Sequence, residues 1–525
     1  MTKREKHLAF AGVLTVLFLA SLNMTVVGTA LPRIIAELQG FDLYAWAFTS
    51  FSLASTVTLP IYGRLSDIYG RKHILQFGIV VFTLASVLSG LSQNMPQLIA
   101  FRALQGIGGG ALMSMAFSTI GDIFSPRERG RYQGFTGAVF GISSVVGPVV
   151  GGLITDSIGW RWVFFVNVPV AIVAFMVIAR FLPKAELRPG QGIDFIGSLL
   201  LVIGMVPLLL ALTWGGADYA WTSPVILGLL VTAAAALGLF GWWQTRTRSP
   251  ILAPELFKNS TFNIANIAGF MTGVGMFGST IYLPLFVQGV QAGSAAESGF
   301  ALTPLMFGMI ISSTVAGILV SKYGHYKPYI VGGLAVMSVG LYLASSMGPD
   351  TSKLVTGAYM VLIGLGLGPA NSLLVLAVQN ALPIRQLGVV TSANQFFRQI
   401  GGTIGVTLFG AMIGRTVGSN ILANMPPELR DLPPESVAQL TDPNLLTNPT
   451  ALERVRVGIE QLAGSAAFER FIDTFRAALG TGIGQVFLVS FALTVVAFIV
   501  TLRLPQHELG DESNVAEFKP KAATE

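Results

Sequence analysis

Long apolar runs recur along the whole of this chain, and they restrict its fold more than any other feature. Each run has about 20 residues, the length that an α-helix needs to cross a bilayer. Backbone polar groups inside lipid are satisfied only in helices and closed barrels, and runs of this length favour helices over short alternating strands. Only 11% of the 525 residues are charged, less than half the share in a soluble domain. The sequence therefore predicts an all-α integral membrane protein.

We expect fourteen membrane spans, because charged loops separate that number of apolar runs. Loops on one side carry most of the Lys and Arg, whereas those on the other side carry mainly Asp and Glu. The positive-inside rule then places both termini in the cytoplasm of a multi-pass protein of the inner (plasma) membrane. The expected spans are residues 8–32, 44–63, 74–92, 96–121, 132–155, 162–182, 193–213, 223–243, 262–287, 299–320, 328–347, 353–379, 389–414 and 481–503.

The composition also disfavours several classes of function. The net charge of +6 follows from the topology signal, so we expect no nucleic-acid partner. The chain has no cysteine, which excludes disulfides, thiol catalysis and cysteine metal sites. Its four histidines lie in loops or tails, and the sequence has neither a phosphate-binding loop nor a nucleophile constellation. We therefore expect no metal, no cofactor and no enzyme activity. The first apolar run continues into further spans, so we expect no cleavable signal.

Short motifs recur in order at offsets of 252 to 258 residues. The recurring pairs are Ala30-Leu31-Pro32 with Tyr282-Leu283-Pro284, Gly63 and Gly70 with Gly317 and Gly324, Gly106-x-Gly108-x-Gly110 with Gly364-x-Gly366-x-Gly368, and Arg131-x-x-Gly134 with Arg385-x-x-Gly388. They indicate two parallel six-helix halves, residues 1–183 and 254–505, an arrangement typical of transporters. The two extra spans form an insert at 184–253.

One outer loop, residues 416–480, is unusually long. Prolines make its first half irregular, whereas residues 451–479 have the apolar spacing of a helix. We interpret this loop as a cover over the outer mouth that packs on itself, and the alternative is a role in binding lipid or a partner. The polar tail, residues 506–525, is expected to be a disordered cytoplasmic segment.

The stretch Gly63–Lys72 packs one acid and three bases into ten residues between two apolar runs. Such a turn must lie at a membrane face, because charges are costly in lipid. The residues at its fixed positions resemble the motif G-x-L-a-D-r-x-G-r-k of the major facilitator superfamily. These residues are Gly63, Leu65, Asp67, Gly70, Arg71 and Lys72.

The resemblance to this family implies that the turn is a gating latch. We expect Asp67 to lie opposite the N-terminal end of the thirteenth span, near Gly388–Ser392, where the helix dipole favours negative charge. We expect Arg71 to pair with Asp122, so that the contacts close the cytoplasmic side of the outward-facing state. The second half has Ser321 in place of the acid, so only one half carries the latch. The alternative is a topology signal alone.

Two further motifs support the resemblance. Arg102-x-x-Gln105-Gly106-x-Gly108 in the fourth span is similar to the family motif R-x-x-Q-G-x-G, whose arginine is linked to proton transfer. An arginine inside a span marks function by default, and a structural anchor between helices is the alternative. The fifth span resembles the antiporter motif g-x3-G-P-x2-G-G, which is typical of exporters, although small-residue packing alone would also explain its glycines. Its residues are Gly141, Gly147, Pro148, Gly151 and Gly152, with Ser143 at the leading small position.

The first span, Leu22–Pro32, resembles the signature L-D-x-T-V-V-x-x-A-L-P of the fourteen-helix drug/proton antiporters, and Trp160–Pro169 matches the same branch. Asn23 stands where that branch has an acid, and asparagine cannot titrate. Three explanations stay open. Asn23 is an engineered stand-in for a protonated aspartate, or it is natural and coupling has moved to Asp67 or Asp122, or transport is uncoupled or coupled differently. The proton-coupling candidates are therefore Asn23, Arg102 and Asp122.

The resemblance places a substrate cavity between the halves near the midplane. Methionine and aromatic side chains can repack around varied apolar ligands, although ordinary helix packing is the alternative for each candidate. Arg398 is a second buried base, which either contacts substrate or braces its span, and we favour bracing. The other cavity candidates are Asn23, Met24, Gln105, Met113, Phe140, Asn266, Met271, Tyr282, Met306, Asn371, Gln379, Asn394 and Gln395.

The leading interpretation is a secondary active exporter of lipophilic compounds, driven by the proton gradient through alternating access. We expect it to act as a monomer, with lipophilic small molecules and membrane lipid as its partners. One alternative is an exporter of a lipid or a specific endogenous metabolite. Another, from a different class, is a membrane sensor or scaffold that does not transport.

Overall fold

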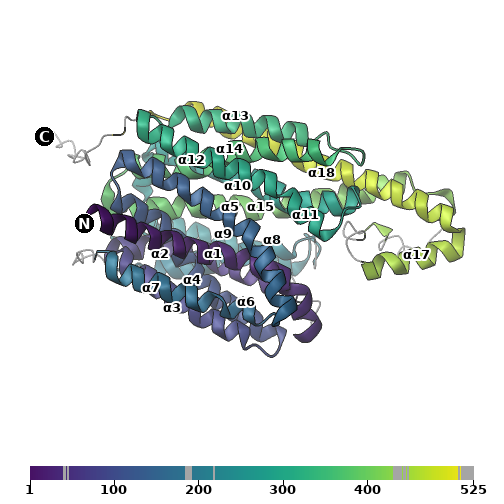
Figure 1. The fold of residues 1–525 in the computed structure, drawn as a ribbon, viewed down its shortest axis with the longest axis horizontal. Helices are drawn as coiled ribbons and strands as arrows, with labels where there is room; N and C mark the ends of the chain where they lie inside the picture. Colours follow the sequence, from purple (N-terminus) through teal and green to yellow (C-terminus); the bar gives the residue numbers. More distant parts are fainter. Residues whose placement is uncertain are drawn as a thin grey trace.

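The structure is a computed structural model that describes residues 1–38, 43, 46–183, 192–216, 219–429, 440–441, 445, 449–506 and 509. In this part of the chain, helices run side by side along the long axis of the molecule (Figure 1). Helix α1 begins, and helix α18 ends, at the same end of this bundle (Figure 1). Both ends of the described bundle core therefore lie on one side, as an even number of crossings requires.

The first half forms seven helices, two of which make one crossing. Polar caps mark several boundaries: the Asn94 side chain accepts a hydrogen bond from Gln97 N at the start of α4, and Ser125 and Glu128 form a capping box at the start of α5. The bounds are α1 (Lys3–Leu38), α2 (Trp46–Tyr69), α3 (Arg71–Gly90), α4 (Met95–Ile123), α5 (Pro126–Ser157), α6 (Trp162–Phe165) and α7 (Asn167–Phe181).

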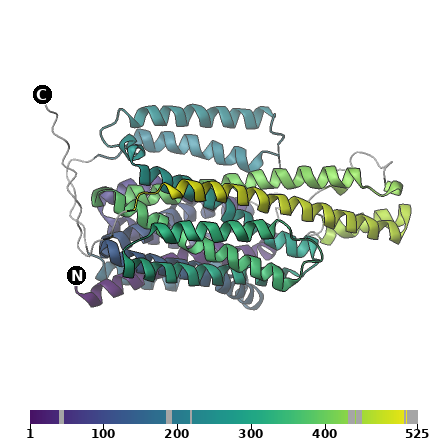
Figure 2. The ribbon, with the colours of Figure 1, turned by 90° about the horizontal axis from the view of Figure 1, so that it is seen from above.

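The insert forms α8 (Phe195–Trp214) and α9 (Pro224–Gln244), which pair at the side of the bundle (Figure 2). Asp194 joins their ends, because its carboxylate accepts hydrogen bonds from Gly197 N, Trp243 Nε1 and Gln244 Nε2, each at 2.8 Å. A buried carboxylate with three donors fixes the start of α8 against the end of α9.

The second half repeats the order of the first, with extra short helices at its turns. Tyr282 and Pro284 lie near the end of α10, where the backbone continues into a π-helical turn. The bounds are η2 (Pro254–Lys258), α10 (Ser260–Leu285), η3 (Phe286–Val290), α11 (Ala295–Ala301), α12 (Thr303–Tyr323), α13 (Lys327–Ala344), α14 (Lys353–Ala381), η4 (Ile384–Gln386), α15 (Leu387–Ala423), η5 (Pro427–Leu429), α17 (Pro449–Ala463) and α18 (Ser465–Leu502).

An outer extension projects beyond the bundle at the end opposite the N-terminus (Figure 1). It consists of the last turns of α15, η5, α17 and the first turns of α18, and its Phe471 and Phe475 are fully buried. The expected loop 416–480 is thus shorter than the sequence indicated, because both flanking helices continue into it. The amphipathic stretch 451–479 is helical, as expected. Most of its proline-rich half, and the tail beyond 506 except Leu509, lie outside the described residues.

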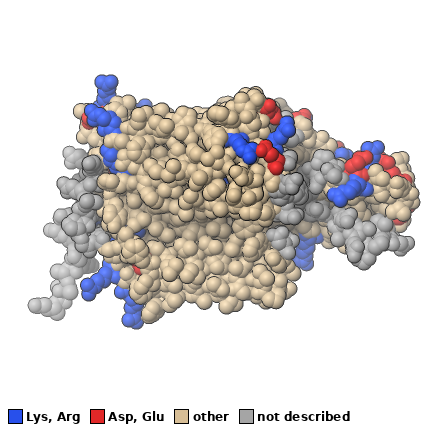
Figure 3. Space-filling model, turned by 90° about the horizontal axis from the view of Figure 1, so that it is seen from below, with Lys and Arg blue, Asp and Glu red and all other residues tan. Residues whose placement is uncertain are grey.

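Thirteen helices of the described part are long and apolar enough to cross a membrane, so the count of fourteen is not confirmed. Each expected span coincides with a helix, but α2 is not among the thirteen. Its serines and threonines lower its mean hydropathy, since they lie on a helix surrounded by other helices and not by lipid. Figure 3 shows the corresponding surface, with a broad uncharged middle and Lys, Arg, Asp and Glu near the two ends.

Candidate gating latch and transport site

The two halves approach closely where α2 crosses α15. Gly63 of α2 has no room for a side chain, because an added Cβ would lie 2.7 Å from the carbonyl oxygen of Gly388. An added Cβ at Gly388 would in turn lie 2.5 Å from the carbonyl oxygen of Gly63. Small residues on both helices therefore let the two backbones touch.

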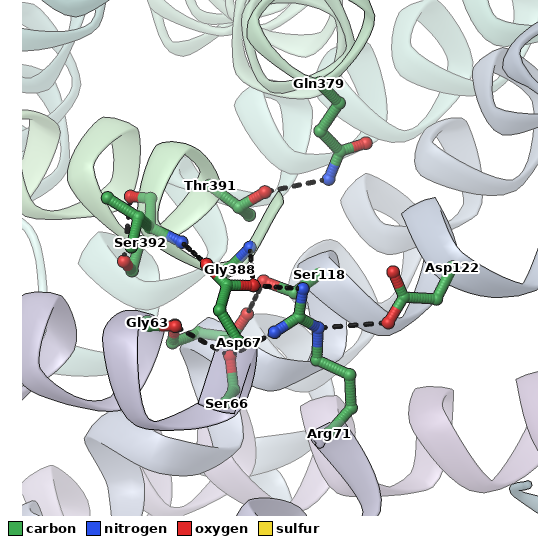
Figure 4. A network of polar contacts seen from close by, with 12 residues as sticks. Gly63, Ser66, Asp67, Arg71, Ser118, Asp122, Gln379, Gly388, Thr391 and Ser392 are labelled. Carbon is green, nitrogen blue, oxygen red and sulfur yellow. Dashed lines mark hydrogen bonds and ion pairs between the residues drawn. The ribbon is translucent and has the colours of Figure 1, made fainter. Parts of the chain in front are cut away.

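Asp67 caps the start of α15 at this crossing (Figure 4). Its Oδ1 accepts a hydrogen bond from Gly388 N and its Oδ2 one from Val389 N, both at 3.0 Å. The first amides of a helix have no partner inside the helix, and they form the positive end of its dipole. The contact between Asp67 and Gly388–Ser392 that the sequence predicted is therefore present, with Asp67 only 7% exposed.

Arg71 ties the turn together from the start of α3 (Figure 4). Its Nη2 lies 2.6 Å from Asp67 Oδ1, its Nη1 donates to Ser66 Oγ at 2.5 Å, and its Nε donates to Asp122 Oδ2 at 3.0 Å. The predicted pair of Arg71 with Asp122 is present. The guanidinium has five N–H donors in a fixed plane, which suits one cation holding two carboxylates.

The remaining residues of the stretch fix its shape. Gly70 has φ 85°, a left-handed conformation that favours glycine, and it separates α2 from α3. Lys72 donates from Nζ to the carbonyl oxygens of Ala179 and Leu182, at 2.6 and 2.8 Å. Lys72 therefore caps the C-terminal end of α7 inside the first half, where a cation is favourable.

Two arginines at the start of α5 add further contacts that the sequence did not predict. Arg127 crosses to the second half, where its Nε donates to Ser321 O at 2.8 Å and its Nη2 to Lys322 O at 2.9 Å. Arg129 donates from Nη1 to Asn380 Oδ1 at 3.1 Å. From the sequence these cations indicate the topology alone. Their position at the positive end of a helix dipole was the available clue, because cations there need compensating acceptors.

Gln379 is placed differently from the expectation that it lines the cavity. It is 1% exposed, donates from Nε2 to Phe117 O at 3.1 Å and to Thr391 Oγ1 at 3.0 Å, and accepts from Gln133 Nε2 at 3.2 Å. Its contacts join α14 to α4, α5 and α15 at the latch end. The sequence could not show this, since every partner except Thr391 is more than 200 positions away.

A second close crossing joins α5 to α12. An added Cβ at Gly134 would lie 2.7 Å from Ser313 O, and Ser313 Oγ donates to Gly134 O at 2.9 Å. Gly130 faces Gly317 in the same crossing. The recurring glycine anchors of the sequence therefore meet at both crossings, Gly63 with Gly388 and Gly317 with Gly130 and Gly134.

The glycines of the antiporter motif serve two interfaces. Gly147 faces Thr25 and Gly151 faces Thr29 on α1, whereas Gly141 faces Ile310 on α12. Thr25 Oγ1 also donates to Ser143 O at 3.1 Å, at the leading small position. Pro148 lies inside α5. An added Cβ at Gly152 meets nothing within 4 Å, so packing explains Gly141, Gly147 and Gly151 but not Gly152.

Two of the proton-coupling candidates, Asn23 and Arg102, are joined through Gln105 in one buried polar chain. Arg102 is 0% exposed, donates from Nε to Ala47 O at 3.0 Å and from Nη1 to Gln105 Oε1 at 2.7 Å, and lies 4.5 Å from the Phe51 ring centre. Gln105 Nε2 then donates to Asn23 Oδ1 at 3.2 Å. The structure thus brings Asn23, Gln105 and Arg102 together, whereas Asp122 lies in the latch.

Among the three residues of this polar chain, two atoms are buried without a hydrogen-bond partner, Asn23 Nδ2 and Arg102 Nη2. A carboxylate at position 23 would offer two acceptor oxygens and no donor, so it would suit both the Gln105 amide and the nearby cation better than an amide does. The site is therefore chemically suited to an acid at the position that Asn23 occupies.

The other cavity candidates come from helices of both halves. Met24 and Met113 are half-buried on α1 and α4, and Phe140 of α5 stacks on Phe117. Tyr282 is 7% exposed and donates to Val406 O at 2.8 Å, which is a packing role inside the second half. Asn371 keeps a buried Oδ1 without a partner on α14.

Arg398 and Gln395 lie on α15 and are hydrogen-bonded to each other. The carbonyl oxygen of Arg398 packs against Gly273 of α10, and the bracing role of the Arg398 side chain stays a prediction. Gln395 Nε2 is buried without a partner. A shared cavity formed by these residues stays a prediction.

Comparison with known proteins gives consistent matches over nearly the whole chain. Residues 13–406 match the Major Facilitator Superfamily. The Multidrug transporter protein MdtP of Bacillus subtilis (strain 168) is 40% identical over 527 residues, covering 99% of this chain and 97% of that protein. Multidrug resistance protein 3 of the same organism is 37% identical, covering 94% of this chain and 93% of that protein.

A solved structure with the same fold is the proton:xylose symporter XylE bound to 6-bromo-6-deoxy-D-glucose. It superposes with a TM-score of 0.61 over 97% of this chain and 98% of that chain, at 12% identity. At this identity the likeness concerns the fold alone.

Proposed function

This chain belongs to the Major Facilitator Superfamily, and on that premise we propose that it is a proton-coupled exporter of lipophilic drugs. The family and fold are those of membrane transporters and not of enzymes. Relatives at 30–40% identity over most of the chain are named as multidrug transporters and efflux pumps, which supports drug efflux. The proposal goes beyond drug efflux in one respect, namely that protons drive the export and move in exchange for the drug.

The observation that carries the transport mechanism is the one-sided closure between the halves. The hydrogen bonds between the halves described above start from the last turn of α2, the last two turns of α4 and the first three turns of α5. Their partners lie in α12 from Ser313 onward, at the end of α14 and at the start of α15. We interpret this arrangement as the outward-facing state of alternating access, in which the two halves are held together at the cytoplasmic end. Release of the latch would let the second half rock and expose the opposite side.

The polar chain at Asn23 supports the first of the three explanations for the missing acid. Its geometry suits a carboxylate, and a titratable group in a span can take up and release protons as the cavity changes sides. We propose that the chain as given is arrested in the protonated form of this step. Asp67 and Asp122 are the alternative coupling groups at the latch.

Inverted membrane vesicles test this proposal. Uptake of a lipophilic cation is measured with and without an imposed pH gradient, for the chain as given and for Asn23→Asp. We expect the gradient to drive uptake by the Asn23→Asp variant at least about tenfold faster than by the chain as given, since only the variant can titrate in the span. An Asn167→Asp variant is the matched control, because it adds a carboxylate at another buried asparagine, on α7 and outside the polar chain.

The outcomes separate the alternatives. Equal gradient-driven uptake by the chain as given and by Asn23→Asp would move the coupling to Asp67 or Asp122. Failure of both forms to move any lipophilic cation would favour an exporter of lipid or of an endogenous metabolite, or a sensor without transport. The proposal also includes fourteen spans in the inner membrane with both termini cytoplasmic, which accessibility labelling of single cysteines in the termini would check.

A further inference from the structure

A pocket of about 330 Å³ lies at the α5–α12 crossing, close to the latch end of the molecule. Arg131 of α5 forms its wall on the first half, and Ile318, Ser321 and Lys322 of α12 form its wall on the second half. Neither the latch nor the Asn23 chain uses these side chains. The pocket therefore offers a guanidinium, an ammonium and a hydroxyl group from two helices that belong to different halves.

One stripe of α12 leads from the uncharged middle of the molecule to this pocket. Phe307, Ile311, Val315 and Ile318 recur at helical spacing and are 57, 53, 48 and 45% exposed. Exposed apolar side chains on a membrane helix face lipid, and the row ends one turn before Lys322. Tyr323, 54% exposed and 5.3 Å from Lys322 Nζ, adds the aromatic ring typical of a membrane interface.

We propose that this pocket binds the phosphate of an anionic phospholipid whose acyl chains lie along the α12 stripe. Arginine and lysine donate charge-assisted hydrogen bonds to phosphate, and the Ser321 hydroxyl can donate a third. Basic pockets between membrane helices on the cytoplasmic side are suited to such head groups. A lipid with net negative charge is favoured over a zwitterionic one because no carboxylate lines the pocket in the described part of the chain.

The phosphate would bridge the halves, because Arg131 and Lys322 come from opposite sides of the crossing. A ligand that contacts both walls binds best when they are together, and it therefore shifts the equilibrium toward the latched state. This conformational effect rests on the alternating access proposed above. The binding itself does not, so the two can fail separately.

Binding is measured by native mass spectrometry of the purified protein with phosphatidylglycerol and, as a reference, phosphatidylcholine. We expect an Arg131→Gln, Lys322→Gln double variant to bind phosphatidylglycerol about twenty-five-fold more weakly, since each cation contributes about a factor of five. The matched control is Arg246→Gln, Arg248→Gln, which removes the same charge from exposed positions after α9. An equal loss of phosphatidylglycerol binding in the control and in the pocket variant would show that overall surface charge, and not the pocket, holds the lipid. That result would overturn the proposal.

The conformational effect is measured between spin labels on cysteines placed at Tyr69 and Ile384, which are exposed on opposite sides of the latch. The chain has no cysteine of its own, so the labels are specific. Nanodiscs with phosphatidylglycerol should show a larger short-distance population than nanodiscs with phosphatidylcholine, and the pocket variant should lose this difference. No difference for the parent chain would overturn the coupling.

The sequence offers one competing occupant, the acidic pair Asp511 and Glu512 that follows Leu509 in the tail. Leu509 N donates to Gly324 O at 3.2 Å, so the tail passes close to the end of α12. An Asp511→Asn, Glu512→Gln variant should bind phosphatidylglycerol as the parent does. A clear gain of lipid binding in this variant would assign the pocket to the tail and overturn the lipid as its natural occupant.

Discussion

The α2–α15 and α5–α12 crossings have the same steric design and opposite electrostatics. Both bring glycines of the two halves into backbone contact, at Gly63 with Gly388 and at Gly317 with Gly130. At the first crossing a carboxylate, Asp67, accepts from the amides that begin α15. At the second crossing the position of the acid is Ser321, and an arginine from the other half donates to the carbonyls that end α12.

The difference teaches which crossing can respond to pH. A carboxylate that caps a helix N-terminus loses its charge when it is protonated, and it then loses most of its attraction for the dipole. An arginine on a helix C-terminus stays charged at any physiological pH, so its attraction for the carbonyl oxygens does not depend on pH. Only the first crossing therefore depends on a side chain that can lose its charge, although the glycine contacts are alike.

The largest expected effect follows from Asp67→Asn. The amide keeps the shape but loses the charge that holds the start of α15 and Arg71. We expect the latched state to lose roughly 2 kcal/mol, about a thirtyfold shift in population. The Tyr69–Ile384 spin-label distance measures it. An unchanged distance distribution in Asp67→Asn would show that the charge of Asp67 does not hold the first crossing together.

Alanine at the crossing glycines tests the shared part of the comparison. Gly63→Ala and Gly134→Ala each place a Cβ 2.7 Å from a carbonyl oxygen of the other half. We expect Gly134→Ala to weaken the latched state by roughly 1.5 kcal/mol or about tenfold. Gly63→Ala should weaken it more, because its Cβ would also clash with Ser392 Oγ. The Tyr69–Ile384 labels follow the first variant. Labels at Glu128 and His325, both exposed, follow the second.

Gly152→Ala is the control for these variants, because a Cβ there meets nothing within 4 Å. It should leave both distances unchanged. A strong effect of Gly63→Ala with none of Gly134→Ala would show that the crossings differ in packing as well as in charge.

A smaller effect is expected for Arg127→Gln at the second crossing. The glutamine retains a hydrogen-bond donor but loses the cation, so we expect about a fivefold shift of the Glu128–His325 distance population. The shift should be the same at pH 6 and pH 8, because arginine keeps its charge over that range. Arg385→Gln, an exposed cation on η4, is the control.

The smallest effect concerns an exposed ion pair at the far end of the first half. Hydrogen bonds from Arg161 and Trp160 hold the pKa of Glu37 below its usual range. A lowered pKa means that Glu37 adds stability above its unfolded pKa of about 4.3 and loses it as pH falls through its folded pKa. Glu37→Gln should lower the melting temperature by about 1 °C at pH 7.

The difference between the Glu37→Gln variant and the parent should shrink as pH falls below the unfolded pKa, because the carboxylate of the parent becomes protonated first in the unfolded and then in the folded state. Thermal melts in detergent at pH 7 and at pH 3.5 check this. A difference that is undiminished at pH 3.5 would indicate packing and not charge as the role of Glu37. The contrast with Asp67 lies in exposure, since solvent screens the Glu37 pair and the helix ends shield the Asp67 contacts.

The sequence predicted the fold class, nearly all the helices and the contacts of Asp67 and Arg71, because those features depend on apolar length and on a motif that resembles a known family. It did not predict the role of Arg127. The partners of Arg127 are backbone carbonyl oxygens of the second half, and backbone groups do not show in the pattern of side chains. Helix ends were the weakest part. The expected span 481–503 begins 16 residues after α18 does, since apolar content marks the lipid zone and not the helix.

That extra length of α18 has a mechanical consequence. A helix of 38 residues is about 57 Å long, whereas the lipid core is about 30 Å thick. The first turns of α18 therefore lie in the outer extension and move rigidly with the rest of the helix, which packs inside the second half. A rotation of the half by a few degrees, too small to see as a change between neighbouring helices, moves the tip of the outer extension by several ångströms. A fluorophore on exposed Leu462 would report the transport cycle from outside the membrane.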